Sequence, residues 1–151
     1  MIDEYARKKL ALEHSRLLSA GDLDGLMRLY GDDVTFEDPV GAGTRTGREA
    51  LRAHLAEAVA AGVRETAGEP VAGQDGRHAL VPVTAVMDYA PRGPGYARRG
   101  WLAPPEEPDR QRLRCEYMLM IQTGPGGLIR SMRAYWGRSD ITVLDAEAGD
   151  A

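Results

Sequence analysis

The sequence is poor in several features that mark whole classes of protein. It holds one cysteine, Cys115, in 151 residues, so no disulfide can form within the chain and a cytoplasmic location is expected. No apolar run approaches the roughly 18 residues of a membrane-spanning helix. The opening MIDEYARKKLAL carries acids where a signal peptide carries bases. We therefore expect neither export nor insertion into a membrane.

The sequence also lacks the marks of nucleic-acid, nucleotide and metal binding. A net charge of -4 and a pI near 5.4 give no basic surface for nucleic acid or an anionic membrane. No spacing of Cys and His suggests a metal site. The glycine-bearing stretch GAGTRTG lacks the Gly-Lys-Ser/Thr that a nucleotide loop requires. No metal, nucleotide or flavin is implied.

What the chain does have is the composition of one soluble globular domain. Hydrophobic residues make up 43% and charged residues 28%, and 151 residues suffice for a single core. No internal repeat is visible. We expect one domain over residues 1–151, with an inserted flap at about 90–110 and a C-terminal tail at about 145–151.

Hydrophobic spacing predicts helices in the first part of the chain. Expected are a helix from Asp3 to about Ala20 that stops at Gly21, a short helix in DLDGLMRLY capped by Asp22, and a helix opened by a Thr46–Glu49 capping box that runs to about Gly62. On the first helix His14 shares a face with leucines and therefore points inward. That position suits a satisfied core histidine as well as a catalytic one.

After Gly62 the period changes to two, which predicts strands. The expected strands are Arg64 to Gly73, His78 to Tyr89, Arg112 to Thr123, Leu128 to Gly137 and a short Asp140 to Leu144. Helices followed by an antiparallel meander indicate an α+β fold, with helices gathered on one face of a curved sheet. The segment Ala90 to Arg110 interrupts the meander with prolines, glycines, Tyr96 and Trp101. Its length favours a flap beside a pocket, or a mobile decoration.

The stretch YGDDVTFEDPVG contains the best candidate for a catalytic group. Val34 and Phe36 alternate with polar residues, and Pro39 ends the predicted strand. A residue before proline is held extended, so the carboxylate of Asp38 is aimed in one direction. An aimed acid in apolar company is a candidate general base. A turn acid that bonds a nearby backbone N–H is the alternative.

Three stretches together resemble the ketosteroid isomerase branch of the nuclear transport factor 2-like, or SnoaL-like, superfamily. They are GDLDGLMRLYGDDVTFEDPVG, TGREALRAHL and SMRAYWGRSDITV. The resemblance implies a cone in which three N-terminal helices and a curved, mostly antiparallel sheet enclose one deep apolar pocket. Within that family the acid of the EDP motif, here Asp38, is the catalytic base.

The departures from the isomerases argue against isomerase chemistry. The isomerases polarise a ketone through a tyrosine and a protonated aspartic acid. Ungapped comparison places His14 and Leu119 at those positions. Leucine cannot donate a hydrogen bond, and the loss of one oxyanion donor typically costs about 100-fold in rate or more.

A different subgroup resembles the chain over most of its length. ARKKLALEHSR, EPVAGQD, VMDYAPRGPGYARRGWL and AYWGRSDITVL are similar to the small epoxide hydrolase/cyclases of polyether ionophore biosynthesis, the monensin and lasalocid type. That resemblance implies a cofactor-free enzyme that opens epoxides of a polyether polyketide by internal hydroxyl attack. It also implies a second catalytic acid, Glu65, in VRETAG. From the residues alone, Glu65 could equally be a solvated strand residue paired with Arg64.

Two carboxyl groups in an apolar cavity suit this reaction, because desolvation and mutual repulsion keep one of them protonated. We assign Asp38 as general base and Glu65 as general acid, with exchange of the roles left open, and His14 as an aid that orients the epoxide oxygen or a carboxylate. The predicted substrate-binding wall, taken from strand faces and the flap, comprises Tyr30, Met87, Trp101, Leu119 and Trp136.

Two rival functions remain open. One is an isomerase or a pyran-forming dehydratase/cyclase that uses Asp38 alone. The other is a non-catalytic regulatory partner of a paralogous cyclase. Members of the superfamily tend to associate through the exposed face of the sheet, so a homodimer is expected, and association with a paralogue is the alternative assembly.

Overall fold

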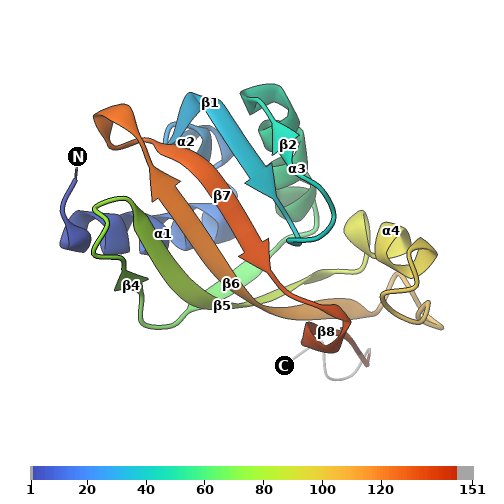
Figure 1. Cartoon of the computed structure of the whole chain (residues 1–151). Coiled ribbons are helices and arrows are strands. Elements are labelled where there is room, and N and C mark those ends of the chain that lie inside the picture. Colours follow the sequence, from blue (N-terminus) through green and yellow to red (C-terminus); the bar gives the residue numbers. More distant parts are fainter. Residues whose placement is uncertain (1, 146–151) are drawn as a thin grey trace.

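The computed structural model describes residues 2–145, and the predicted tail at 145–151 lies almost wholly outside them. The described chain begins with helices and continues as strands, as the change of period predicts (Figure 1). The α-helices are α1 (Glu4–Ala20), α2 (Leu23–Met27), α3 (Arg48–Ala60) and α4 (Arg92–Arg98). No helix within residues 2–145 is both long enough and apolar enough to cross a bilayer.

The first two helices are capped as the sequence predicts. The side chain of Asp3 accepts a hydrogen bond from the Ala6 N–H at 2.8 Å, and α1 ends at Gly21 in the left-handed conformation that favours glycine (φ 71°). The side chain of Asp22 caps α2 through the Gly25 N–H at 2.9 Å. These local signals therefore place the turn that leads into the first strand.

Two predicted boundaries are wrong. Tyr30 does not end the second helix; it begins strand β1 (Tyr30–Glu37), where it pairs with Ile129. Thr46 does not cap α3, because it pairs with Thr35 in the sheet, so the helix starts from Gly47 (φ 102°) without a side-chain cap. In both places pairing within the sheet overrides a local helix signal.

The strands of residues 2–145 form one sheet in the order β2-β1-β7-β6-β5-β3, to which β4 adds beside β5 and β8 beside β6. Only the β1–β7 pair among them is parallel. The predicted strand 64–73 is divided into two short strands. The remaining bounds are β2 (Arg45–Thr46), β3 (Arg64–Ala67), β4 (Val71–Ala72), β5 (His78–Asp88), β6 (Arg112–Thr123), β7 (Ile129–Tyr135) and β8 (Ile141–Leu144).

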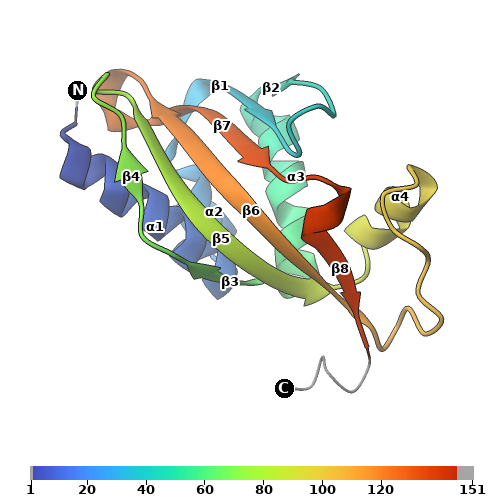
Figure 2. The same ribbon diagram turned by 60° about the horizontal axis from the view of Figure 1, so that its bottom comes forward.

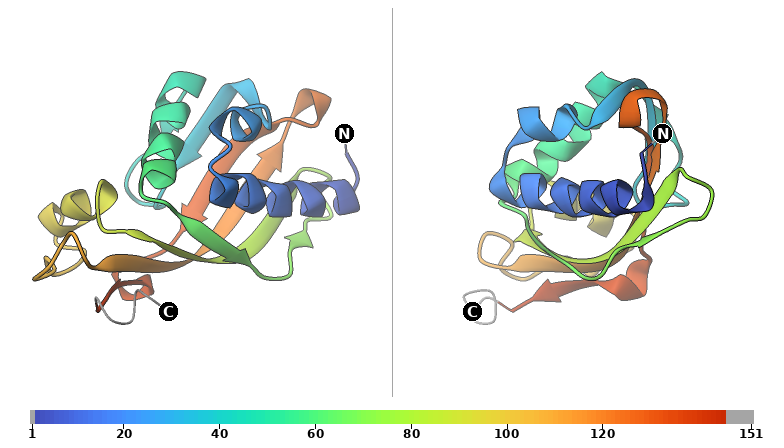
Figure 3. Two further views of the ribbon diagram at one scale, coloured as in Figure 1. Left: turned by 180° about the vertical axis from the view of Figure 1, so that it is seen from behind. Right: turned by 90° about the vertical axis from the view of Figure 1, so that its left-hand side faces the viewer.

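The sheet is strongly curved, and α1, α2 and α3 lie against its concave side (Figures 2 and 3). Alternate residues along β5 and β6 face these helices and are buried. Examples are Val81 and Val83 on β5 and Leu113, Leu119 and Ile121 on β6. The helices and the curved sheet thus surround a common interior, which is the predicted α+β arrangement.

The flap at 90–110 is partly ordered into a helix rather than being an irregular loop. Its helix α4 lies at the end of the molecule away from the N-terminus, beyond the end of β5 (Figures 1 and 2). The rings of Tyr96, Trp101 and Trp136 pack together, with centroids 5.2–5.6 Å apart. This aromatic cluster fixes α4 to the end of the sheet.

Candidate active site

An inner cavity lies between the helices, the concave face of the sheet and α4. It encloses about 600 Å³ of empty space, part of which is open to solvent. Its wall is mostly apolar, with a small number of polar groups. The apolar lining includes Leu18, Leu55, Val63, Ala85, Met87, Leu119 and Met132, and the polar lining comprises His14, Asp38, Glu65, Arg92, Tyr96, Tyr117 and Trp136.

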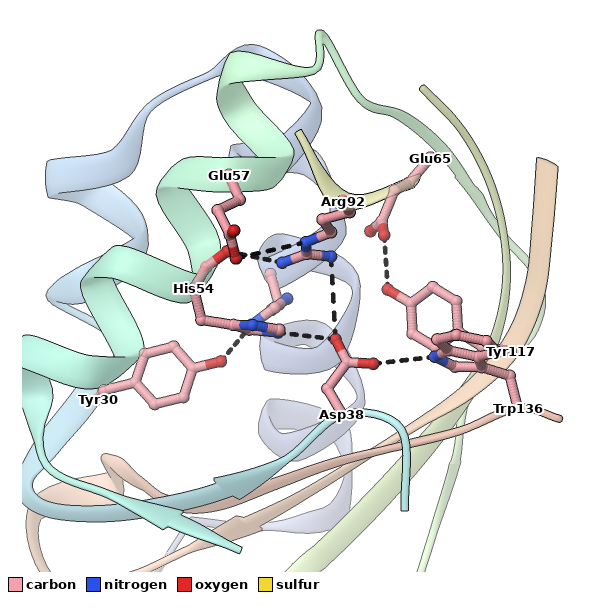
Figure 4. A network of polar contacts seen from close by, with 9 residues as sticks. Tyr30, Asp38, His54, Glu57, Glu65, Arg92, Tyr117 and Trp136 are labelled. Atoms are coloured by element: carbon pink, nitrogen blue, oxygen red, sulfur yellow. Dashed lines mark hydrogen bonds and ion pairs between the residues drawn. The ribbon is translucent and has the colours of Figure 1, made fainter. Parts of the chain in front are cut away.

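Asp38 reaches this cavity from the end of β1, directly before Pro39. Trp136 donates its indole N–H to one carboxylate oxygen at 2.9 Å, and Nε2 of His54 lies 2.8 Å from the other (Figure 4). The guanidinium of Arg92 is 4.0 Å from the carboxylate. The side chain is only 15% exposed, so these groups replace most of its water.

The neighbours of Asp38 keep it ionised. Burial by itself would raise the pKa of this carboxyl group. The hydrogen bond and charge of His54 act against burial, followed by the charge of Arg92 and the Trp136 N–H, and together they lower the pKa to about 2. Asp38 is therefore a carboxylate at neutral pH and can accept a proton.

Glu65 reaches the same cavity from β3. Ser15 of α1 donates to Oε1 at 2.8 Å, and the Tyr117 hydroxyl of β6 donates to Oε2 at 2.5 Å (Figure 4). The hydroxyl of Ser19 accepts from the backbone N–H of Glu65 at 2.8 Å, which holds β3 against α1. Three elements thus fix the position of this carboxyl group.

The environment of Glu65 favours its protonated form. Burial is the largest influence and raises the pKa, and the negative charge of Asp38 raises it further. The hydrogen bonds from Tyr117 and Ser15 oppose this rise but do not cancel it. One cavity therefore presents a carboxylate, Asp38, together with a carboxyl group that tends to keep its proton.

His14 lies in the wall of the cavity as a neutral imidazole. Its Nε2 is hydrogen-bonded to the Tyr30 hydroxyl, and its Nδ1 is buried without a partner among residues 2–145. Burial lowers the pKa of His14 to about 4. The ring is thus a neutral hydrogen-bonding group at neutral pH, with one buried nitrogen that has no partner within residues 2–145.

Arg92 connects the flap to the acid at Asp38. It donates to the backbone carbonyl of His54 at 2.6 Å and lies 4.0 Å from both Asp38 and Glu57. Its side chain is mostly buried. Since Arg92 is the first residue of α4, the charge beside Asp38 depends on where the flap sits (Figure 4).

The sequence profile of the SnoaL-like domain matches residues 11–132. The chain belongs to the SnoaL-like family. The match includes both candidate acids, the second part of α1, all of α2 and α3, and most of the sheet.

Two relatives of this SnoaL-like domain are enzymes by name. Epoxide hydrolase LasB of Streptomyces lasalocidi is 53% identical over 148 residues, which is 97% of this chain and 52% of that protein. The chain thus spans about half the length of that curated relative. The structure of the epoxide hydrolase/cyclase-like enzyme SalBIII, described in pyran ring formation in polyether salinomycin, is 33% identical with a TM-score of 0.79, covering 95% of this chain and 100% of that one.

A more distant solved structure shares the fold alone. RV0760c from Mycobacterium tuberculosis, solved in complex with estradiol-17beta-hemisuccinate, is 20% identical with a TM-score of 0.70, and the match covers 90% of this chain and 97% of that one. Together with SalBIII, this neighbour confirms the predicted nuclear transport factor 2-like fold of the SnoaL-like domain.

The structure places most of the residues predicted for the site around the inner cavity of the SnoaL-like domain. These are Asp38, Glu65, His14, Met87, Leu119 and Trp136. Tyr30 does not line this cavity; it is buried, and its hydroxyl is hydrogen-bonded to Nε2 of His14, which does line it. Trp101 stacks in the aromatic cluster and lines an outer pocket.

Three polar residues of the SnoaL-like domain were not predicted for the site. His54 neighbours an apolar stripe on α3, a position typical of a structural residue, yet its Nε2 is hydrogen-bonded to Asp38. Tyr117 alternates with Cys115 and Leu119, and a hydroxyl on that apolar face was the available signal. Nothing in the sequence indicated that Arg92 would fold back from the flap. No group of three or more His, Cys, Asp or Glu side chains in residues 2–145 is arranged to hold a metal ion.

Proposed function

We propose that this protein is a cofactor-free epoxide hydrolase/cyclase that opens epoxides of a polyether polyketide by attack of the substrate's own hydroxyl group. The observation that carries the proposal is the pair of acids on one mostly apolar cavity whose surroundings shift their pKa values in opposite directions. Internal epoxide opening needs one group to take a proton and another to supply one.

The geometry supports Asp38 as the base and Glu65 as the acid. The carboxylate of Asp38 removes the proton from the attacking hydroxyl as its oxygen bonds to an epoxide carbon. The carboxyl group of Glu65 gives a proton to the epoxide oxygen as the C–O bond breaks. The product is a cyclic ether with a new hydroxyl, and transfer of a proton from Asp38 to Glu65, through solvent, restores the starting state.

His14 is proposed to assist at the epoxide oxygen. If the Tyr30 hydroxyl donates to Nε2, the tautomer leaves an N–H on Nδ1, which has no partner among the described residues. That N–H can donate to the oxygen as negative charge develops on it. Met87, Leu119 and Trp136 supply wall against which the chain folds, so that hydroxyl and epoxide carbon meet in line.

The relatives support the same reaction class. Epoxide hydrolase LasB matches 97% of this chain, and the epoxide hydrolase/cyclase-like SalBIII matches 95% of it. By contrast, Leu119 is buried in the cavity wall at the position where isomerases carry a hydrogen-bond donor. A ketone oxygen would therefore lack a donor at this position.

The proposal is tested with a synthetic hydroxy-bisepoxide ester, with products and ring sizes determined by NMR. We expect cyclic ether from the wild type and a loss of kcat/KM of about 100-fold or more in both Asp38→Asn and Glu65→Gln, the usual contribution of one general acid or base. The exposed acids Asp32 and Glu69 provide matched controls, so Asp32→Asn and Glu69→Gln should retain wild-type turnover.

Other outcomes separate the rival functions. Loss in Asp38→Asn alone would indicate an isomerase or a dehydratase/cyclase that uses a single base. No turnover by the wild type would contradict the proposal and favour the regulatory role. In that role, the Asp38→Asn variant should still change the rate of a paralogous cyclase when the two are mixed.

Assembly with a second domain is part of the proposal. The curated relative is about twice as long as the stretch that this chain matches, which leaves room there for a second unit of similar size. We propose that this chain associates with a second copy of itself as a homodimer, or alternatively with a paralogue, through the outer face of the sheet. The cytoplasmic location expected from the single cysteine stays a prediction.

A further inference from the structure

A second, outer chamber lies on the other side of Asp38. It is bounded by the loop after β1, by α3 and by α4, and it shares Asp38, Arg92 and Tyr96 with the inner cavity. The outer chamber encloses about 770 Å³, part of it open solvent. A chain that passes between the two spaces runs alongside the proposed base.

The outer chamber is rich in arginine, although the protein as a whole is acidic. Arg45, Arg92, Arg98 and Arg99 all line it, and the only carboxylates in its described lining are those of Asp38 and Glu57. The positive charge is therefore concentrated at the entrance to the candidate active site.

Three of these arginines have no carboxylate partner in the part of the chain that the structure describes. Within residues 2–145, no carboxylate lies within 4.0 Å of Arg45, Arg98 or Arg99. Arg45 lies over the ring of Phe36 at 5.1 Å, and Arg99 lies over Trp101 at 4.8 Å. These ring contacts orient the guanidinium groups but leave their N–H donors available.

The fourth arginine carries a buried donor without a partner. The Nε of Arg92 is inaccessible to solvent and makes no hydrogen bond within the described chain, since Glu57 is 4.0 Å away. A buried N–H of this kind is costly unless a ligand or water satisfies it. Arg92 as a residue lines both chambers.

We propose that the outer chamber binds a terminal oxyanion, a carboxylate or phosphate, carried by the epoxide-bearing chain. Guanidinium groups match both anions through paired N–H donors. This inference rests on the proposed function for its substrate and adds an anchoring site to it. With the anion held by Arg98 and Arg99, the apolar part of the chain extends past Asp38 into the inner cavity.

The helix sets the distance between anchor and chemistry. Arg92 and Arg98 are six residues apart on α4, which corresponds to an axial rise of about 9 Å. A chain anchored at Arg98 would therefore place atoms several bonds from its anionic end beside Asp38. Arg98, which is exposed, and Arg92, which is mostly buried, belong to the same helix. Anion binding at Arg98 would therefore also fix the position of the Arg92 charge beside Asp38.

The first test measures binding without turnover. Octanoate, octyl phosphate and 1-octanol are titrated into the protein and followed by the fluorescence of its two tryptophans, Trp101 and Trp136, with calorimetry as a second readout. We expect at least one anion to bind more tightly than the alcohol. The double variant Arg98→Ala/Arg99→Ala should weaken the binding of that anion about 10-fold, as expected when hydrogen bonds to a charged group are lost.

The control removes the same charge elsewhere. Arg28→Ala/Arg130→Ala alters two exposed arginines outside both chambers and should leave anion binding unchanged. Because Arg99 also contacts Trp101, the single variant Arg98→Glu serves as a second test, and it should also lower the affinity for the anion. Preference for octanoate or octyl phosphate identifies which oxyanion the site takes.

Equal affinity for the anions and the alcohol, or anion affinity that is unchanged in both arginine variants, would overturn the inference.

The second test compares a hydroxy-bisepoxide acid with its methyl ester. We expect Arg98→Ala/Arg99→Ala to raise KM for the acid and to leave KM for the ester unchanged. If neither compound reacts, the proposed function fails, while the octanoate titration still decides on the oxyanion site.

Discussion

The surroundings of Asp38 and Glu65 shift the pKa values of these two similar side chains in opposite directions. His54, Arg92 and Trp136 give Asp38 opposite charge and hydrogen bonds, so its pKa falls to about 2 in spite of burial. Glu65 has hydroxyl donors but no cation in contact, so burial prevails and its pKa rises. The proposed assignment of Asp38 as base and Glu65 as acid, which the sequence leaves exchangeable, rests on this difference.

The pH dependence of kcat/KM should follow from these directions. Asp38 is ionised above about pH 2, so no acidic limb from it is expected in the accessible range. Glu65 loses its proton as the pH rises through its raised pKa, and activity should fall about 10-fold per pH unit beyond that point. Ser15→Ala removes a hydrogen bond that lowers this pKa, so the descending limb should move to higher pH. A limb that stays in place would contradict the assignment of Glu65.

Individual residues differed in how well the sequence revealed them. Asp38 could be found because a proline follows it at the end of an alternating strand, and Glu65 came only from the family resemblance. His54 and Tyr117 lie at helical and strand spacing among apolar residues, where a core role is equally compatible with the pattern. Arg92 lies 54 positions after Asp38, and no local pattern reports such a contact.

Helix α4 is the element that completes the site, and one glycine controls how closely it packs. A Cβ added at Gly93 would lie 2.3–2.8 Å from atoms of the Tyr89 ring, closer than side chains can approach. The Gly93 N–H also donates to the Tyr89 carbonyl at 2.6 Å. Close contact at this point places Arg92, the preceding residue, beside Asp38.

Gly93→Ala should therefore displace α4 and reduce kcat/KM by about 10-fold or more, since a shift of about 1 Å in positioning groups can cost more than that. Gly95→Ala is the matched control on the same helix, because its Cβ would meet only Arg98 at an ordinary 3.7 Å. Kinetics and tryptophan fluorescence of both variants provide the measurement. Equal activity of the two would show that the position of α4 is unimportant for turnover.

Elements were predictable where local chemistry and tertiary structure agree. The caps at Asp3 and Asp22 and the stop at Gly21 are local and were confirmed. The predictions for the start of β1 at Tyr30 and for the cap of α3 were wrong, because pairing between strands decides both positions. The helix within the proline-rich flap depends on packing of Tyr96 against Trp136, which lies 40 residues later.

At the scale of the whole molecule, the outer face of the sheet carries exposed apolar residues that suit association. Met118 and Tyr135 are paired in register on β6 and β7, and they are 37% and 39% exposed. If this face joins two copies, Met118→Lys should weaken the dimer about 10-fold or more and leave the circular dichroism spectrum unchanged. Analytical ultracentrifugation decides, and a monomeric wild type would contradict the homodimer.

The mostly apolar wall of the inner cavity has a consequence for the fate of the reaction. Under the proposed function, an epoxide opened there is captured either by the hydroxyl of its own chain or by water. A wall that offers water few hydrogen bonds keeps water scarce, and Arg92 and Tyr96 of α4 close part of the boundary. The ratio of cyclic ether to diol among the products would then measure how well the inner cavity excludes water from the opened epoxide.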